Sequence, residues 1–174
     1  MLTARRMFEK LKPFDPEFIE QPVPGRTGAE GLSRLRAVTN IPIAADQTAY
    51  SADDIFELCR NRAADVIVLG LHEACGVVRF RKAAAVAEAA GVNICLHGVF
   101  ETGITTCASN QVAATLNNMD DGNQIMWQLL AEDIVTRPSL IPKDGGLPVS
   151  DLPGLGFELN WDAVARAAEA HRKQ

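Results

Sequence analysis

A short pattern recurs through residues 18–97 and constrains the fold more than any other feature of the sequence. Apolar runs end at Glu20, Asp46, Gly70 and His97, so their ends lie about 25 residues apart, which leaves room for one strand, one helix and two loops. Because such crossovers connect parallel strands, the pattern predicts a βα repeat whose strands all end at the same edge. Polar residues at successive strand ends are typical of the site of a parallel β/α barrel.

The limits of the expected elements follow from the apolar runs and from the helix-start and turn residues between them. The expected strands span residues 18–22, 41–45, 66–70 and 92–97. The expected helices span residues 3–12, 29–38, 52–60, 77–90 and 103–117. The runs at 66–69 and 92–96 are apolar on both faces, as in parallel strands that are covered on both sides. Residues 124–127 are a candidate for one further strand.

After residue 136 the βα pattern stops. Asp144-Gly145-Gly146 predicts a hairpin-type turn, and residues 153–159 predict a turn followed by a short strand. Asn160 is placed to cap a final helix over residues 161–172. We therefore expect two parts, namely a partial (β/α) barrel over residues 1–136 and a C-terminal extension over residues 137–174.

The composition excludes several classes of partner and location. The formal net charge is −5, and the chain has no long basic run that would bind a nucleic acid or an anionic membrane. No apolar run approaches the roughly 18 residues of a membrane span, and the N-terminus lacks the apolar core of a signal peptide. The four cysteines have no C-x-x-C spacing, so reduced thiols are expected. We expect a soluble cytoplasmic protein that binds neither nucleic acids nor membranes.

Glu20 and Asp46 stand where two buried strands are expected to end. A carboxylate in such a place costs folding free energy unless it is paired or holds a metal ion. The residues alone leave both explanations open. Either the two acids hold a metal ion, or they are solvated or ion-paired, for instance with Arg26 or Arg62.

Four segments resemble motifs of the enolase superfamily, in its mandelate racemase and muconate lactonising enzyme branch. Residues 18–23 (FIEQPV) resemble the motif of its fourth barrel strand, and residues 43–47 (IAADQ) resemble that of its fifth strand. Residues 95–104 (CLHGVFETGI) resemble its seventh-strand segment. Residues 144–159, with DGGLPV and PGLGFEL, resemble the family's C-terminal return to its capping domain. The motifs follow one another in the family's order over essentially the whole chain.

The resemblance implies an α/β fold that is the C-terminal part of a TIM-like (β/α) barrel, about strands four to eight, with a C-terminal extension to a capping domain. The N-terminal half of such an enzyme, with the capping domain and the first three strands, is expected to be absent. An open half-barrel has two long unpaired edges, which native proteins avoid. We therefore expect a homo-oligomer or a separate N-terminal half as partner.

The resemblance also implies a metal site. In the family a magnesium ion holds a substrate carboxylate while a base removes the α-proton. The acids Glu20 and Asp46 correspond to metal ligands, and Gln47 stands where glutamate is common. Mg²⁺ prefers oxygen ligands, so the two carboxylates suit it. Gln47 is expected to contact a small carboxylate substrate.

His97 stands where racemase-like members keep a catalytic histidine, and its ordinary pKa suits a general base. In those members an aspartate at the preceding strand end orients the histidine, and other members have a lysine there, whereas this chain has Gly70. His97 therefore acts alone, is oriented by Glu101 or by a residue outside the chain, only binds substrate, or is structural. His72 and Glu73 line the site or are solvated loop residues. Glu101 contacts substrate or stabilises a helix N-terminus.

The function implied for a complete enzyme is magnesium-dependent abstraction of a proton alpha to a carboxylate. The reaction would be the racemisation, epimerisation or dehydration of a small organic acid. We take His97 as the catalytic residue, and His72, Gln47 and Glu101 as residues that bind the substrate. The alternative is a catalytically inactive fragment or half-barrel that needs a partner chain.

Overall fold

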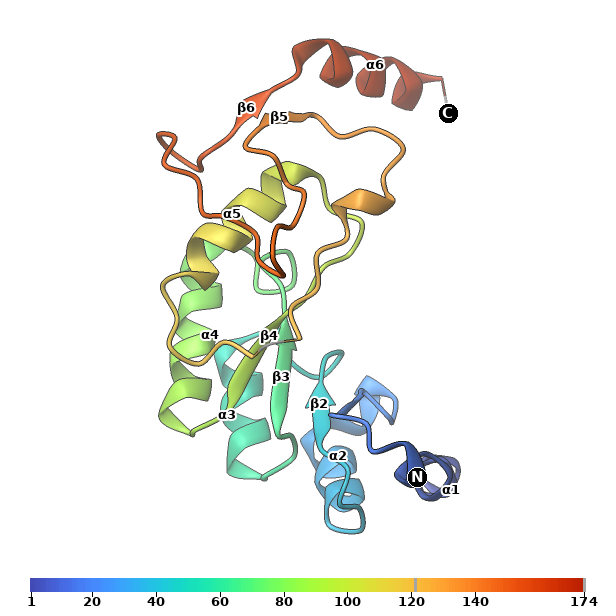
Figure 1. Cartoon of the computed structure of the whole chain (residues 1–174). Coiled ribbons are helices and arrows are strands. Elements are labelled where there is room, and N and C mark those ends of the chain that lie inside the picture. The colour runs from blue at the N-terminus through green and yellow to red at the C-terminus, as the bar shows by residue number, and fades with distance from the viewer. Residues whose placement is uncertain (121, 174) are drawn as a thin grey trace. The chain divides into compact units, whose positions relative to one another are not determined.

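The structure of the chain is a computed structural model, which describes residues 1–120 and 122–173 (Figure 1). It divides into two compact units. The first unit comprises residues 1–97 and 117–123, and the second comprises residues 98–116 and 124–174.

The first unit contains the predicted βα repeat. Its four strands are all parallel and follow one another in the sheet in chain order. They are β1 (Ile19–Glu20), β2 (Ile43–Ala45), β3 (Val66–Leu69) and β4 (Asn93–Leu96). The helices are α1 (Leu2–Leu11), α2 (Gly28–Arg36), α3 (Ala52–Arg60) and α4 (Val77–Ala89), of which the last three connect successive strands. The predicted parallel α/β architecture is therefore confirmed.

Local sequence signals set the ends of these helices. The Ser51 side chain accepts a hydrogen bond from the backbone N–H of Asp54, and Asp53 and Asp54 place negative charge in the first turn of α3. Gly91 follows the end of α4 with φ of 71°, a left-handed conformation that glycine adopts without a steric cost. Along α4, Phe80 and three alanines are buried, so α4 packs closely against α3.

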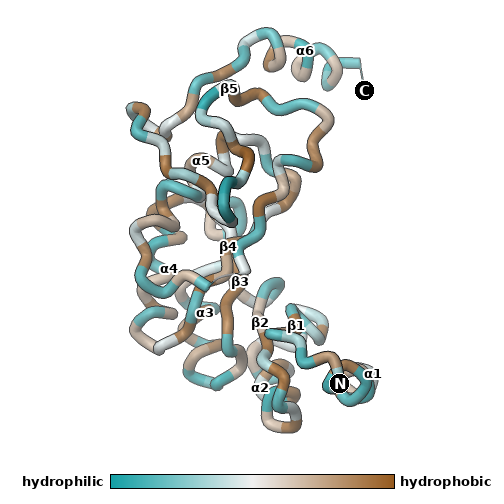
Figure 2. Tube along the Cα trace, viewed as in Figure 1, coloured by the Kyte–Doolittle hydropathy of each residue, from teal (hydrophilic) through white to brown (hydrophobic). Residues whose placement is uncertain are grey.

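The core of the first unit lies along β2, β3 and β4, whose residues are all buried except Asn93. Figure 2 shows the hydropathy along these strands. Ile43, Ile67, Val68 and Ile94 have no exposed surface. This burial explains why the two long apolar runs show no polar alternation, since helices or other core residues cover each face.

An ion pair ties α2 to the start of two strands. The Asp65 carboxylate precedes β3 and accepts hydrogen bonds from the Arg36 guanidinium and, at 3.0 Å, from the backbone N–H of Ile43. Burial opposes ionisation of this carboxyl. The hydrogen bonds from Arg36 and Ile43 outweigh that effect and hold the pKa of Asp65 below its usual value.

The second unit carries the C-terminal elements. They are α5 (Gly103–Ala113), a 3₁₀ turn (Trp127–Leu129), β5 (Val135–Arg137), β6 (Glu158–Leu159) and α6 (Trp161–Arg172). Strands β5 and β6 pair antiparallel. The expected turn at 144–146 is confirmed by paired hydrogen bonds between Lys143 and Gly146. The expected cap is also confirmed, because Asn160 accepts from the backbone N–H of Ala163.

Two expectations for the second unit are wrong. Residues 124–127 form no strand, because the backbone turns into the 3₁₀ helix at Trp127, whose indole N–H donates to the Leu140 carbonyl at 3.0 Å. The helix expected over 103–117 ends at Ala113, and the Thr115 hydroxyl then donates to the Val112 carbonyl. Strand β5 was not expected, since it is defined by its pairing with the distant β6. Among the described helices, none is both long and apolar enough to cross a membrane.

Asp65→Asn tests the ion pair that anchors α2. At pH 7 we expect a loss of about 1.5–3 kcal/mol in the free energy of unfolding, because hydrogen bonds to a charged group are replaced by neutral ones. The folded-state pKa lies below the unfolded value of about 3.9, so the stabilisation is complete above that value and is lost as the pH falls through the folded-state pKa. The difference between the two proteins should therefore narrow below about pH 4.

Urea unfolding at several pH values measures this difference. Glu9→Gln, at an exposed site on α1, serves as the control and should change the free energy of unfolding by less than about 0.5 kcal/mol. A loss for Asp65→Asn that is the same at pH 3 and pH 7 would contradict the proposed role of its charge.

Candidate active site

Four residues mark the carboxyl ends of the parallel strands in the first unit. Glu20 ends β1, Asp46 follows β2, Gly70 follows β3 and His97 follows β4. Because the strands are parallel and in chain order, these residues share one edge of the sheet, as the spacing predicts. The turn after β3, which carries His72 and Glu73, lies at the same edge.

Asp46 is a buried acid with one unsatisfied oxygen. Its exposed fraction is 1%, its Oδ2 accepts from the Gln47 amide, and its Oδ1 has no hydrogen-bond partner among the described residues. Oδ1 lies 3.6 Å from Nδ1 of His97. Burial raises the pKa of Asp46 to about 6; the charge of His97 opposes the shift, and the charges of Glu73 and Glu20 add to it. A cation would stabilise the ionised form at this position.

Gln21 joins the ends of β1 and β2. Its Oε1 accepts from the backbone N–H of Asp46 at 3.0 Å and from the Thr48 hydroxyl at 3.3 Å, while its amide donates to the Val23 carbonyl. Gln21 has φ of 36°, a left-handed conformation that costs free energy for a non-glycine residue. These contacts hold Asp46 next to the strand end that carries Glu20.

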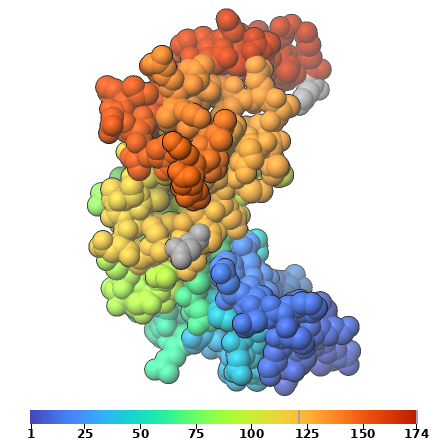
Figure 3. Space-filling model, viewed as in Figure 1, coloured from blue at the N-terminus to red at the C-terminus, as the bar shows by residue number. Residues whose placement is uncertain are grey.

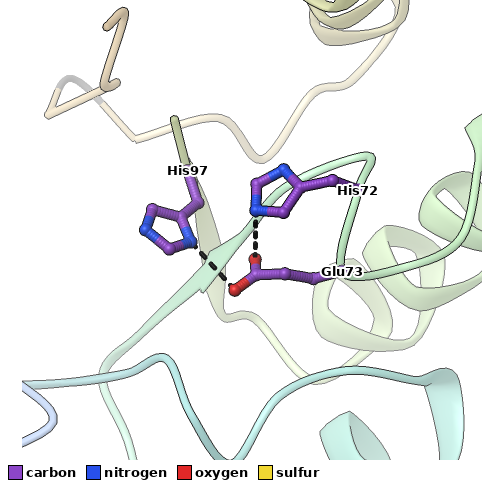
Figure 4. A group of neighbouring side chains, drawn as sticks. All are labelled: His72, Glu73 and His97. Atoms are coloured by element: carbon purple, nitrogen blue, oxygen red, sulfur yellow. Dashed lines mark hydrogen bonds and ion pairs between the residues drawn. The ribbon is translucent and has the colours of Figure 1, made fainter. Parts of the chain in front are cut away.

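His97 has a carboxylate partner, Glu73. Its Nδ1 lies 2.9 Å from Oε1 of Glu73 (Figure 4). The second oxygen, Oε2, accepts from the backbone N–H of Gly70 at 2.8 Å. The Glu73 hydrogen bond raises the pKa of His97; burial opposes the shift, and the charges of Glu73, Asp46 and Glu20 add to it. Burial alone would raise the pKa of Glu73, but its bonds to His97 and Gly70 hold it below its usual value.

Gly70 makes room for the His72 ring. A Cβ atom at position 70 would lie 2.5 Å from Cε1 and 2.7 Å from Nδ1 of His72, and 2.9 Å from the His97 carbonyl oxygen. The ring of His72 therefore occupies space that any side chain at position 70 would need. Its centroid is 5.5 Å from that of the His97 ring.

The structure brings together most of the residues predicted for the site. Glu20, Asp46, Gln47, His72 and His97 all belong to the first unit. Glu101 belongs to the second unit, where its carboxylate accepts from the backbone N–H of Val99.

From the sequence alone, the partner of His97 stays open and Gln21 does not stand out. The structure shows that Glu73 is that partner, although it lies three residues beyond the strand end. The one sequence signal for this arrangement is the glycine at position 70, since a strand end without a side chain allows the following turn to fold over it.

Comparison with known proteins identifies the family. A family model described as Enolase C-terminal domain-like matches residues 1–163. The chain belongs to this family. Its relatives place it in the mandelate racemase and muconate lactonising enzyme branch of the enolase superfamily, which confirms the resemblance seen in the motifs.

Muconate cycloisomerase 1 of Rhodococcus opacus is 35% identical over 165 residues, which are 94% of this chain and 43% of that protein. The crystal structure of muconate cycloisomerase from Pseudomonas fluorescens has 34% identity and a TM-score of 0.83, over 94% of this chain and 45% of that one. These matches confirm the expected fold, the C-terminal part of a TIM-like barrel. The chain spans less than half the length of the curated relatives it matches.

A dipeptide epimerase from Cytophaga hutchinsonii, solved with Mg and the dipeptide D-Ala-L-Val, has a TM-score of 0.87 at 23% identity. The match covers 94% of this chain and 44% of the epimerase chain. At this identity the likeness concerns the fold alone.

Gly70→Ala tests the space that His72 occupies. We expect it to lower the free energy of unfolding by about 1–3 kcal/mol, because the new methyl group overlaps the imidazole and a backbone oxygen. In a His72→Ala background the same change should cost less, since the ring contact is gone. Gly122→Ala is the matched control, as its Cβ would meet atoms only at 3.5 Å and beyond. Equal costs of Gly70→Ala in the two backgrounds, measured by urea unfolding, would refute the overlap.

Proposed function

We propose that this chain carries part of the active site of an enzyme that abstracts a proton alpha to a carboxylate with the help of Mg²⁺. The proposal rests most on Asp46, a buried acid whose Oδ1 lacks a hydrogen-bond partner among the described residues and lies close to the His97–Glu73 pair. The named relatives are muconate and chloromuconate cycloisomerases, which supports catalysis of the enolase-superfamily type.

The residues at the sheet edge fit a magnesium ion. Glu20 and Asp46 offer carboxylate oxygens, the ligand type that Mg²⁺ prefers. The Gln47 amide occupies Oδ2 of Asp46 and leaves Oδ1 for a cation. When bound, the ion would supply positive charge that stabilises the negative charge developing on the substrate carboxylate.

His97 is the proposed general base. With Nδ1 bonded to Glu73, the proton of a neutral imidazole lies on Nδ1 and the lone pair on Nε2 can accept a proton. The Glu73 carboxylate would then stabilise the imidazolium that forms, and it fixes the orientation of the ring. The His97 side chain is 15% exposed, so most water that would compete with the substrate for Nε2 is excluded.

The proposed substrate is a small carboxylic acid. We take Gln47, His72 and Glu101 as the residues that contact the substrate, and the first two lie at the sheet edge beside Asp46 and His97. The reaction class is racemisation, epimerisation, dehydration or cycloisomerisation, which share a C–H bond alpha to a carboxylate that is broken or formed.

A magnesium titration by calorimetry, with wild type and Asp46→Asn, tests the proposed ion site. We expect Asp46→Asn to weaken Mg²⁺ binding by at least about tenfold, because an amide is a poorer ligand than a carboxylate and carries no charge. Asp53→Asn, an exposed acid on α3, is the control and should leave the affinity unchanged. Equal Mg²⁺ affinity of wild type and Asp46→Asn would refute the assignment.

The same samples test the base. Proteins loaded with Mg²⁺ are incubated in D₂O with a panel of small 2-hydroxy and 2-amino acids, and exchange of the α-proton is followed by NMR. Where the wild type exchanges an acid, His97→Asn should slow the exchange by about 10²-fold or more while binding Mg²⁺ as before. Undiminished exchange in His97→Asn would contradict its role as the base.

A second candidate function is that of a half-barrel which requires a partner chain. Strand β1 lies at one edge of the four-stranded sheet. Helix α1 lies near this strand, since Met7 and Ile19 line the same cavity. The N-terminal residues, blue in Figure 3, include Leu2, Met7 and Phe14, which are 62%, 45% and 78% exposed. Large apolar side chains exposed near a sheet edge indicate a surface that a partner chain covers in the functional protein.

Size-exclusion chromatography with light scattering tests this candidate. We expect a mass above that of an 18.8 kDa monomer, and we expect Phe14→Asp to shift the protein towards the monomer. Val78→Asp, at an exposed site on α4, is the control and should not change the mass. A stable monomer that catalyses α-proton exchange by itself would exclude this candidate.

A further inference from the structure

Three side chains at the same sheet edge converge in a way that magnesium chemistry does not require. His72, Glu73 and His97 each place one potential ligand atom so that all three atoms lie within 4.8 Å of one another. Figure 4 shows both imidazole rings directed at the two oxygens of the Glu73 carboxylate. Nδ1 of His97 is 2.9 Å from Oε1, and Nε2 of His72 is 4.0 Å from Oε2.

The backbone holds these three residues in place. His97 follows β4, and its N–H donates to the Leu69 carbonyl at 3.1 Å. The turn after β3 is closed by hydrogen bonds from Ala74 to Gly70 and from Gly76 to Leu71. The ligand atoms therefore sit on a strand end and on a tight hydrogen-bonded turn, which is the kind of support that a preformed site needs.

The donor set selects a class of metal ion. Two imidazole nitrogens and one carboxylate oxygen are typical ligands of Zn²⁺ and related transition-metal ions, whereas Mg²⁺ takes oxygen ligands. In a tetrahedral zinc site the ligand atoms lie about 3.3 Å apart. This value lies between the distances from Glu73 to His97, 2.9 Å, and from Glu73 to His72, 4.0 Å. The His72 side chain is 37% exposed, compared with 15% for His97 and 10% for Glu73, so an ion and a fourth ligand from solvent can enter from its side.

A buried carboxylate lies beside this cluster. Oδ1 of Asp46 has no hydrogen-bond partner among the described residues, is buried, and lies 3.6 Å from Nδ1 of His97. The Asp46 and Glu73 carboxylates thus border the same imidazole nitrogen. Positive charge placed at this nitrogen would be attracted by both carboxylates.

We propose that His72, Glu73 and His97 form a binding site for a divalent transition-metal ion of the zinc class, distinct in its ligands from the magnesium site proposed at Glu20 and Asp46. With the metal ion on Nδ1, the single proton of the neutral His97 imidazole is carried by Nε2 instead of Nδ1, and a proton is released to solvent only from the protonated form of the ring. One consequence rests on the proposed function: with the metal ion on Nδ1 and the proton on Nε2, the His97 ring has no free lone pair with which to accept a substrate proton. Zinc would therefore inhibit proton abstraction.

The test is a zinc titration of the full chain in competition with a chromophoric chelator, in buffer with excess Mg²⁺ to keep the oxygen site filled. His72→Ala should weaken Zn²⁺ binding by at least about tenfold, since it removes one of three protein ligands. His171→Ala is the matched control, because His171 is the remaining histidine of the sequence and is exposed on α6. Cys75→Ser is a second control, since the exposed Cys75 thiol is another possible zinc ligand. Both controls should bind Zn²⁺ as the wild type does.

Two further measurements check that His72→Ala is folded and identify the ligand atoms of the metal ion. Circular dichroism checks that His72→Ala is folded, and His72→Gln replaces it if it is not. Substitution with Co²⁺ gives a visible d–d spectrum that reports nitrogen and oxygen ligands directly, and His72→Ala should change it whereas His171→Ala should not.

Unchanged zinc affinity in His72→Ala, or an equal loss in Cys75→Ser or His171→Ala, would overturn the proposal. The magnesium titration separates this outcome from the proposed function. His72→Ala should leave Mg²⁺ affinity intact, while Asp46→Asn lowers it, so either site can fail without the other.

Discussion

The burial of Asp46 at the end of β2 is the interaction around which the functional edge is arranged. A buried carboxylate needs compensating charge or hydrogen bonds, and this one accepts from the Gln47 amide on Oδ2 and lies near the His97 imidazole. Gln21 then fixes the backbone of Asp46 from β1, and Glu73 fixes His97 from the turn after β3. The contacts of all four strand ends are thus organised around one acid.

Most of the first unit could be predicted from the sequence, because its spacing and apolar runs follow local rules. The interval between strand ends specifies parallel crossovers, and these place Glu20, Asp46 and His97 at one edge. The pairing of Glu73 with His97 could not be predicted in this way. It depends on how the turn after Gly70 folds back over the strand, which is a matter of three-dimensional contact rather than of spacing.

The second unit was less predictable for a similar reason. Strand β5 exists through its pairing with β6, more than twenty residues further along the chain, and neither run is long enough to be read by itself. The apolar residues at 125–127 suggested a strand, but the indole of Trp127 is anchored on Leu140 and the backbone follows that contact. The expected boundary at residue 136 stays a prediction, as do the roles assigned to individual site residues.

The missing side chain at position 70 has a wider consequence. The imidazole of His72 lies in the space that a side chain at position 70 would fill. A large side chain at either position therefore excludes a large side chain from the other. Two proteins of this fold could therefore carry the functional side chain at different positions, one at position 70 and the other at position 72, if the other position stays unfilled. The sheet register and the helices would be untouched, so chemistry here can diverge while the scaffold remains the same.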